Sequence, residues 1–278
     1  MTTFQQKSVF VNAALALIAL TYIYRVFTSR VEVFGVGTHP SSANTTSCYN
    51  KHVHSRFEAE DNVIVMDENN NLQVLRLVEL DRSSNTLVPF TQEFRVHGFD
   101  IYWDSIDPTE LTFMFVNHQR TGAGISIFRH RIGTKFLQFV KTVKSPLLYA
   151  PNDVVATSRS TFYATNDMRS TSRVMRKIEM LLGMPWGHVV YYGHEGMVIK
   201  AAAGISYPNG IARSADGNTI FVAASSEPSV NMYRPRLDGS LELVGKTVFR
   251  NFVPDNVSVD TATGQVLVSG KLRGIVFM

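Results

Sequence analysis

This chain of 278 residues contains a single cysteine, Cys48, only two tryptophans and only 18% charged residues. One cysteine cannot form a disulfide within the chain, which excludes a small disulfide-stapled fold but leaves the cellular compartment open. The net charge is only +4, and no basic stripe is interleaved with aromatic residues. These absences argue against nucleic-acid binding. The length and the 45% hydrophobic content suffice for one substantial core.

One hydrophobic run approaches the length of a membrane span, and it lies near the amino terminus. No charged residue occurs from Ser8 to Tyr24, Lys7 precedes the run and Arg25 follows it. The run is at the short end for a span, and the two tyrosines at its end resemble an interfacial belt. We expect residues 1–30 to form a hydrophobic helix that acts as a signal anchor. A cleaved signal peptide and a buried helix are the alternatives.

The anchor hypothesis sets the expected location of the rest of the chain. It places residues 51–278 in the secretory pathway, in the endoplasmic reticulum lumen or at the cell surface, tied to a membrane through the amino-terminal helix. A cleaved signal would instead give a secreted protein. We expect residues 31–50 to be a polar linker. The linker contains Asn44-Thr45-Thr46, which makes Asn44 a candidate glycosylation site.

From residue 51 onward the chain consists of short β-rich runs that follow turn residues, such as Leu72–Val78, Leu111–Val116 and Thr219–Ala223. Turn signals at regular spacing predict hairpins. Arg173–Met184 differs, because its apolar residues have helical spacing and predict a short helix across one face. The sequence therefore predicts an all-β domain over residues 51–278, either a propeller or a sandwich.

Polar residues recur along this region at nearly regular intervals. They stand at positions 60–61, 97, 152–153, 209 and 255–256. Intervals of about 40 to 60 residues are close to the roughly 40–50 residues of a propeller blade and favour the propeller. A propeller brings one inner strand of each blade to a common channel, where these side chains can meet. Carboxylate and amide oxygens predict a site for a hard cation such as calcium.

Several longer motifs resemble the paraoxonase/arylesterase family. They are Leu148–Val155, Phe162–Asp167, Trp186–Tyr192, Pro208–Ile211 and Asp255–Asp260. Glu60-Asp61, His97-Gly98 and Asn117-His118 lie in the matching order upstream. The resemblance extends from about residue 48 to the end of the chain. It implies a six-bladed β-propeller, within the usual range of about four to eight blades.

The resemblance implies two calcium ions in the central tunnel, one catalytic and one structural. The ligands that it implies for the catalytic ion are Glu60, Asn152, Asn209, Asp255 and Asn256. For the structural ion it implies Asp61, Asp153 and the backbone carbonyl of Phe99. Two carboxylates and three neutral amides would hold the catalytic ion and still allow it to polarise a substrate.

The activity that the resemblance implies is hydrolysis of aryl esters and lactones, with water attacking a small-molecule substrate at the catalytic calcium. It assigns His97 and His118 to a relay that activates the water, with Glu60 as an alternative base. The alternative function is a non-catalytic, membrane-tethered propeller that keeps calcium for stability. A related hydrolase of the gluconolactonase kind is a third hypothesis. The natural substrate and the oligomeric state do not follow from the sequence.

Three features depart from the family pattern. Met168 stands where the family often has histidine, and Lys271-Leu272 stands where it often has His-Pro. Both substitutions are expected near the tunnel mouth and bear on substrate range more than on calcium binding. Family members continue beyond residue 278, so we expect an incomplete last blade and an exposed strand edge. The resemblance also implies that Cys48 pairs with a cysteine in that further segment.

Overall fold

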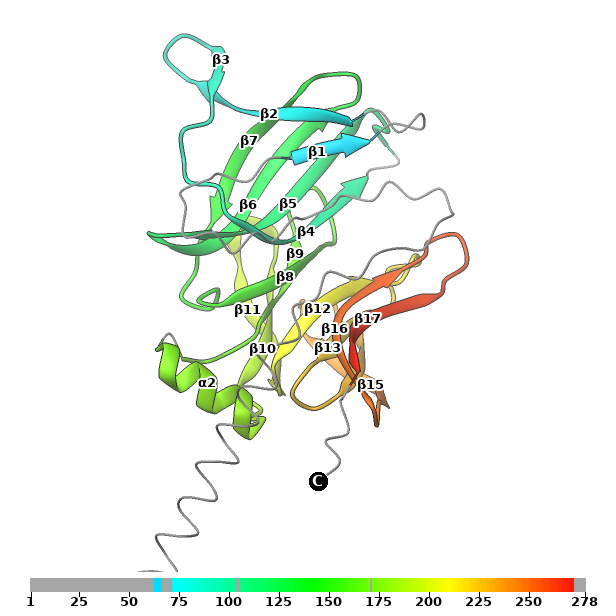
Figure 1. Cartoon of the computed structure of the whole chain (residues 1–278). Coiled ribbons are helices and arrows are strands. Elements are labelled where there is room, and N and C mark those ends of the chain that lie inside the picture. Colours follow the sequence, from blue (N-terminus) through cyan, green and yellow to red (C-terminus); the bar gives the residue numbers. More distant parts are fainter. Residues whose placement is uncertain (1–62, 67–71, 104–105, 171, 273–278) are drawn as a thin grey trace, which may run out of the picture. The chain divides into compact units, whose positions relative to one another are not determined.

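A computed structural model describes residues 63–66, 72–103, 106–170 and 172–272, all within one compact unit, Thr46–Met278. The described part is mostly β-strand, as the sequence predicts (Figure 1). The predicted amino-terminal helix, Asn44, Cys48 and Glu60-Asp61 lie outside the described residues. None of the helices that the structure describes has the length and hydropathy of a membrane span.

Three antiparallel groups of four strands follow one another along the chain, and the first group belongs to a seven-stranded sheet. The first contains β4 (Val96–Trp103), β5 (Glu110–Gln119), β6 (Gly122–Arg131) and β7 (Phe136–Val143). The second contains β8 (Pro151–Ala156), β9 (Phe162–Asn166), β10 (Gly187–Tyr192) and β11 (Val198–Ile205). The third contains β12 (Pro208–Arg213), β13 (Ile220–Ala224), β14 (Ser229–Pro235) and β15 (Leu241–Val248).

Two smaller groups of strands lie before and after these sheets in the sequence. The later group is a two-stranded sheet of β16 (Phe252–Val259) and β17 (Val266–Leu272). The earlier group is β1 (Val63–Met66), β2 (Leu72–Asp81) and β3 (Thr86–Pro89). The sequence predicts a separate blade here. Instead, β2 pairs in parallel with β7 and extends the first sheet, because β7 is an outer strand whose edge can accept another strand.

The first strands of successive sheets are neighbours: β4 contacts β8, β8 contacts β12, and β12 contacts β16. Figure 1 shows β8, β12 and β16 following one another from green through yellow to orange. This is how inner strands are arranged in a β-propeller. The described ranges hold three four-stranded groups, the strands β1–β3 and the two-stranded sheet β16–β17, and the number of six blades stays a prediction.

Strand β5 illustrates how the sheets share their cores. Successive residues of a strand point to opposite faces. Phe113 and Phe115 face an aromatic cluster with Phe128 of β6. Met114 and Val116 face a second cluster, which includes residues of β8, β9 and β10. Because both faces are buried, the centre of β5, Phe113–Val116, appears in the sequence as an uninterrupted apolar run.

Helix α2 (Arg173–Leu182) lies between β9 and β10 and confirms the predicted helix, which ends at Leu182 rather than at Met184. Gly183 ends it in the left-handed conformation, at φ 61°, where glycine has no steric penalty. A single 3₁₀ turn, η1 (His194–Gly196), joins β10 to β11.

Candidate functional site

Each of the four inner strands is interrupted by a β-bulge at the predicted site residues. In each strand two residues lie opposite one residue of the neighbouring strand: His97-Gly98, Asn152-Asp153, Asn209-Gly210 and Asp255-Asn256. A bulge opens the hydrogen-bond ladder and re-aims the side chains. The positions that the sequence predicts to meet are therefore the positions at which all four inner strands leave regular pairing.

Glycine allows two of these bulges to approach the next inner strand closely. A Cβ on Gly98 of β4 would lie 2.7 Å from the carbonyl oxygen of Asn152 in β8, and nearer still to the Asp153 carboxylate. A Cβ on Gly210 of β12 would lie 2.6 Å from the Asn256 Cα in β16. Side chains do not tolerate such distances, so glycine is required where these backbones meet.

Asp153 connects β8 to β12. Its Oδ1 accepts a hydrogen bond from the Val154 N–H (2.9 Å), and its Oδ2 accepts one from the Ile211 N–H (3.0 Å). Removal from water raises the pKa of the Asp153 carboxyl to about 7; the two backbone donors oppose this shift, and the nearby Asp100 adds to it. A carboxylate whose charge is disfavoured in this way is stabilised by a bound cation.

Asp100 of β4 is a second acidic group near Asp153, and the sequence analysis did not identify it. Its Oδ2 accepts from the Ala156 N–H of β8 (2.8 Å). Burial raises the pKa of Asp100 to about 6, although the backbone hydrogen bonds and the charge of Arg213 oppose the shift. Strand alternation could have revealed it, because Asp100 lies two residues after Gly98 and shares its face.

Asn209 of β12 is in direct contact with Asp255 of β16, since its Nδ2 donates to Asp255 Oδ1. The same nitrogen lies 3.3 Å from Ser225 Oγ, and the Asn209 carbonyl accepts from Thr165 Oγ1 (2.6 Å). The two ends of an amide have nearly the same shape, so a 180° rotation would turn its oxygen toward Asp255. Two such oxygens on adjacent strands are suited to a shared hard cation.

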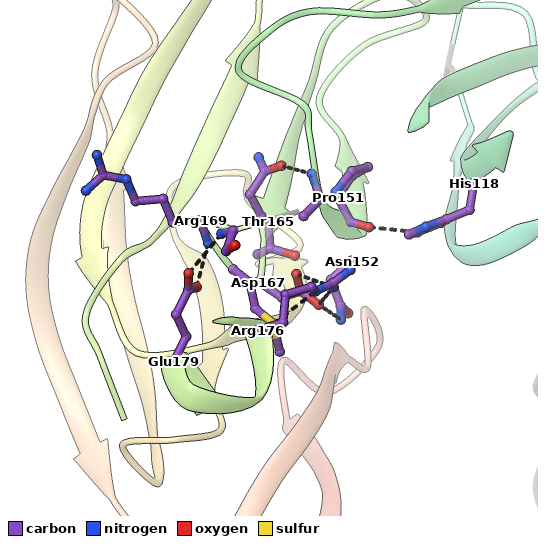
Figure 2. Close-up of polar contacts among 12 residues, drawn as sticks. His118, Pro151, Asn152, Thr165, Asp167, Arg169, Arg176 and Glu179 are labelled. Atoms are coloured by element: carbon purple, nitrogen blue, oxygen red, sulfur yellow. Dashed lines mark hydrogen bonds and ion pairs between the residues drawn. The ribbon is translucent and has the colours of Figure 1, made fainter. Parts of the chain in front are cut away.

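His97 and His118, the predicted proton relay, lie side by side. Their ring centroids are 5.4 Å apart in an edge-to-face arrangement, and both residues are exposed. His118 Nε2 donates to the Pro151 carbonyl (2.9 Å), next to Asn152 in the chain (Figure 2). A carbonyl only accepts, so this hydrogen bond places a proton on Nε2. The structure thus brings the pair beside the β8 bulge, and its role in catalysis stays a prediction.

A polar group from the α2 side lies next to Asn152 (Figure 2). Asp167 Oδ2 lies 3.5 Å from Asn152 Nδ2, and Arg176 Nη2 lies 3.3 and 3.4 Å from the two Asp167 oxygens. Burial raises the pKa of Asp167, and Arg176 opposes this shift. Neither Asp167 nor Arg176 was predicted from the sequence as a site residue. Asp167 ends a recognised motif, but only the fold shows its contact with Arg176.

The two substituted positions of the family pattern differ in their surroundings. Met168 is buried, and its Sδ accepts from Arg176 Nε (3.1 Å). Lys271 lies in β17 opposite Val253 and is exposed. A thioether is only a weak acceptor. Met168 therefore contributes a contact for Arg176 in place of an ionisable side chain.

The remaining predicted ligands are only partly covered. Asn256 is exposed, and Phe99 is half-buried immediately after the β4 bulge. Glu60 and Asp61 lie outside the described residues, so each predicted ligand set lacks one carboxylate. Among the residues that the structure describes, no three His, Cys, Asp or Glu side chains form a metal-binding group. The predicted sites depend on asparagine as well.

The described residues fit a calcium ion by the chemistry of their donors. Asn152, Asn209 and Asp255 supply amide and carboxylate oxygens from three inner strands, and oxygen is the ligand atom that calcium prefers. Asp153 supplies a carboxylate whose negative charge is disfavoured without a cation. Both properties meet the preference of a hard cation for oxygen ligands and negative charge.

The sequence is similar to a known protein family and to individual members of it. A family described as Arylesterase matches residues 62–276. Serum paraoxonase/arylesterase 1 of Mus musculus is 30% identical over 197 residues, which cover 71% of this chain and 54% of that protein. Serum paraoxonase/arylesterase 2 of Gallus gallus is 34% identical over 174 residues, which cover 62% of this chain and 48% of that protein. The chain spans about half the length of these relatives.

A solved gluconolactonase from Xanthomonas campestris is 16% identical, with a TM-score of 0.46 over 75% of this chain and 62% of that one. This structural likeness is too distant to assign any residue. The family match, in contrast, covers most of the chain and contains all four bulges. Because one family accounts for residues 62–276, the chain belongs to the arylesterase family.

Proposed function

We propose that this protein hydrolyses aryl esters and lactones and that it depends on calcium to do so. The observation that carries the proposal is the set of bulges on four adjacent inner strands. They place Asn152, Asn209 and Asp255 on neighbouring strands, and the His97–His118 pair lies beside the β8 bulge, where His118 contacts the Pro151 carbonyl. Membership of the arylesterase family supports ester or lactone hydrolysis as the reaction class.

The residues proposed to hold the catalytic calcium are Glu60, Asn152, Asn209, Asp255 and Asn256, and those proposed for the structural calcium are Asp61, Asp153 and the Phe99 carbonyl. When bound, the catalytic ion supplies a positive centre for the carbonyl oxygen that gains charge as water attacks. The contacts of Asp153 with β12 make its position part of the fold rather than of a mobile loop. Because Asp153 is adjacent to Asn152, a fixed position for Asp153 also restrains a proposed ligand of the catalytic ion, and rigid ligands favour such electrostatic stabilisation.

The histidine pair is proposed to move the proton of the attacking water. With Nε2 of His118 donating to Pro151, Nδ1 is the basic nitrogen of the neutral ring. The ring centroids of His97 and His118 lie 5.4 Å apart, so the proposed relay passes the proton between neighbouring rings. The pair can therefore take a proton from water and return it to the departing alcohol or to the opened lactone.

Hydrolysis of phenyl acetate and of a γ-lactone by the purified protein tests this proposal. We expect turnover that a chelator abolishes and that added calcium restores. Asn209→Ala should reduce calcium affinity and turnover together, whereas Asn218→Ala, in an exposed turn, should change neither. Turnover that persists in excess chelator would contradict the proposal. Calcium binding without any hydrolysis would favour the non-catalytic alternative.

A further inference from the structure

We propose that Arg176 of helix α2 is a positioning residue, which acts through Asp167 to fix the orientation of the Asn152 amide. Met168 helps to hold Arg176 in place for this role. The inference rests on the proposed function, because it takes Asn152 to be a calcium ligand. It adds a connection between the bulge in β8 and a helix inserted between β9 and β10.

The chemistry of an amide explains why its orientation matters. Asparagine binds a hard cation through Oδ1, whereas Nδ2 can only donate hydrogen bonds. In the structure Nδ2 of Asn152 faces Asp167 Oδ2 at 3.5 Å, at the long limit of a hydrogen bond. An ionised carboxylate only accepts, so it favours the nitrogen on its side and repels the oxygen. Asp167 therefore leaves Oδ1 at the other end of the amide for a cation.

Water has little access to replace this contact. Asn152 is 6% exposed and Asp167 is 8% exposed. An unpaired carboxylate at such a position would be strongly disfavoured. Arg176 provides the opposite charge, with Nη2 at 3.3 and 3.4 Å from the two carboxylate oxygens. One guanidinium thus contacts both oxygens of Asp167 and constrains the direction of its carboxylate.

Two contacts on consecutive residues determine where the guanidinium lies. Nη2 of Arg176 contacts Asp167, and Nε donates to Met168 Sδ (3.1 Å). A planar guanidinium that is held at two of its nitrogens cannot rotate freely. A lysine ammonium has a single charged centre and cannot make the same pair of contacts. Met168, which replaces the histidine that family members often have, therefore forms one unit with Arg176.

Helix α2 is itself attached to the segment that follows Asp167. The buried carboxylate of Glu179 accepts from the backbone N–H of Arg169 (2.8 Å) and from that of Ser170 (2.9 Å) (Figure 2). Ser226 Oγ also donates to the Met180 carbonyl (3.4 Å). An ion pair between mobile surface side chains contributes little. The Arg176–Asp167 pair differs, because the helix is anchored one turn beyond Arg176.

Four variants test the proposal in the full chain. Arg176→Met removes the guanidinium and keeps an unbranched side chain, and Arg176→Lys restores the charge alone. Lys177→Met is the matched control, because it removes one positive charge from the adjacent, exposed position of α2. Asn152→Ala removes the amide through which Arg176 is proposed to act. Isothermal titration of calcium-stripped protein with calcium measures affinity, and KM and kcat are measured in parallel.

We expect Arg176→Met to weaken calcium affinity by about tenfold, as removal of an outer partner of a metal ligand commonly does. Arg176→Lys should recover part of this loss, and Lys177→Met should leave the affinity within about twofold. At saturating calcium the kcat of Arg176→Met should return close to the wild-type value with little change in KM. A general loss of structure would not be reversed by calcium in this way.

The double variant that combines Arg176→Met with Asn152→Ala separates a positioning role of Arg176 from a merely structural one. If Arg176 acts through Asn152, the tenfold effect of Arg176→Met should disappear in the Asn152→Ala background. An equal loss in both backgrounds, or no loss in either, would overturn the inference. If Asn152→Ala leaves calcium affinity and hydrolysis unchanged, the proposed function itself fails at this residue. Should Arg176→Met not fold, Asp167→Asn enters the same cycle with the same expected outcome.

Discussion

Asp153→Asn should stabilise the calcium-free protein at pH 8 and reduce the stabilisation that calcium provides, because Asp153 is a proposed ligand of the structural ion only. The pKa of Asp153 is raised from 3.8 to about 7 in the folded state, chiefly by burial. Between about pH 4 and about pH 7 the folded protein therefore binds a proton that the unfolded chain has released. The free energy of unfolding falls as the pH rises through this window and stays low above it. Asparagine has no proton to lose and should abolish this fall.

The size of the effect follows from the same shift and from two hydrogen bonds. A difference of roughly 3 pKa units at about 1.4 kcal/mol each sets an upper limit of about 4 kcal/mol above pH 7. Asp153 accepts from both Val154 N–H and Ile211 N–H, whereas the amide of asparagine can accept from only one of them. The lost acceptor costs about 1–3 kcal/mol. A net gain of about 1–3 kcal/mol at pH 8 remains, which corresponds to a few degrees in Tm.

Thermal unfolding in excess chelator at pH 8 and at pH 4.5 measures this gain. We expect a higher Tm for Asp153→Asn at pH 8, and no gain at pH 4.5, where the wild-type carboxyl is protonated in the folded state. Added calcium should then raise the Tm of the wild type more than that of the variant, which keeps only the proposed catalytic site. Asp216→Asn is the control. Hydrogen bonds from Ser214 and Asn218 lower the pKa of this exposed carboxyl, so this substitution should lower the Tm at pH 8 instead of raising it. Parallel pH profiles for wild type and Asp153→Asn would refute the reasoning.

Three further predictions concern the metal, the histidine pair and the strand contacts. Chelation should lower the Tm of the wild type, because a ligand that binds only the folded state stabilises it by about 2.7 kcal/mol at 100 times its Kd. A Tm that does not change with calcium would contradict both predicted metal sites. His118→Gln should slow ester hydrolysis and leave calcium affinity unchanged, since His118 is a proposed relay whose Nε2 donates to the Pro151 carbonyl and is not a proposed calcium ligand. An unchanged kcat would exclude His118 from the mechanism. Gly98→Ala should destabilise the fold by about 1–3 kcal/mol in denaturant unfolding, because its Cβ would lie 2.7 Å from the Asn152 carbonyl oxygen; a wild-type midpoint would show that β4 and β8 can separate without loss.

Local patterns were sufficient for most of the elements. The run Leu111–Val116 became part of β5, and the helical spacing after Arg173 became α2, because hydrophobic periodicity reflects burial directly. The spacing of the polar pairs along the chain was also informative, because each pair from His97 onward lies in the next inner strand. The pairing of β2 with β7 was not predictable, because a strand edge can accept any strand that reaches it.

The sequence by itself determined which side chains are available to the site: carboxylates and asparagines at blade-like intervals, two histidines, and glycine after His97 and Asn209. Only the tertiary structure decided how they are presented. The register that opens a bulge at each inner strand depends on the partner strand, and the contact from Arg176 to Asp167 joins a helix to the strand before it. Such contacts arise when sheets and helix pack together, and no local periodicity encodes them.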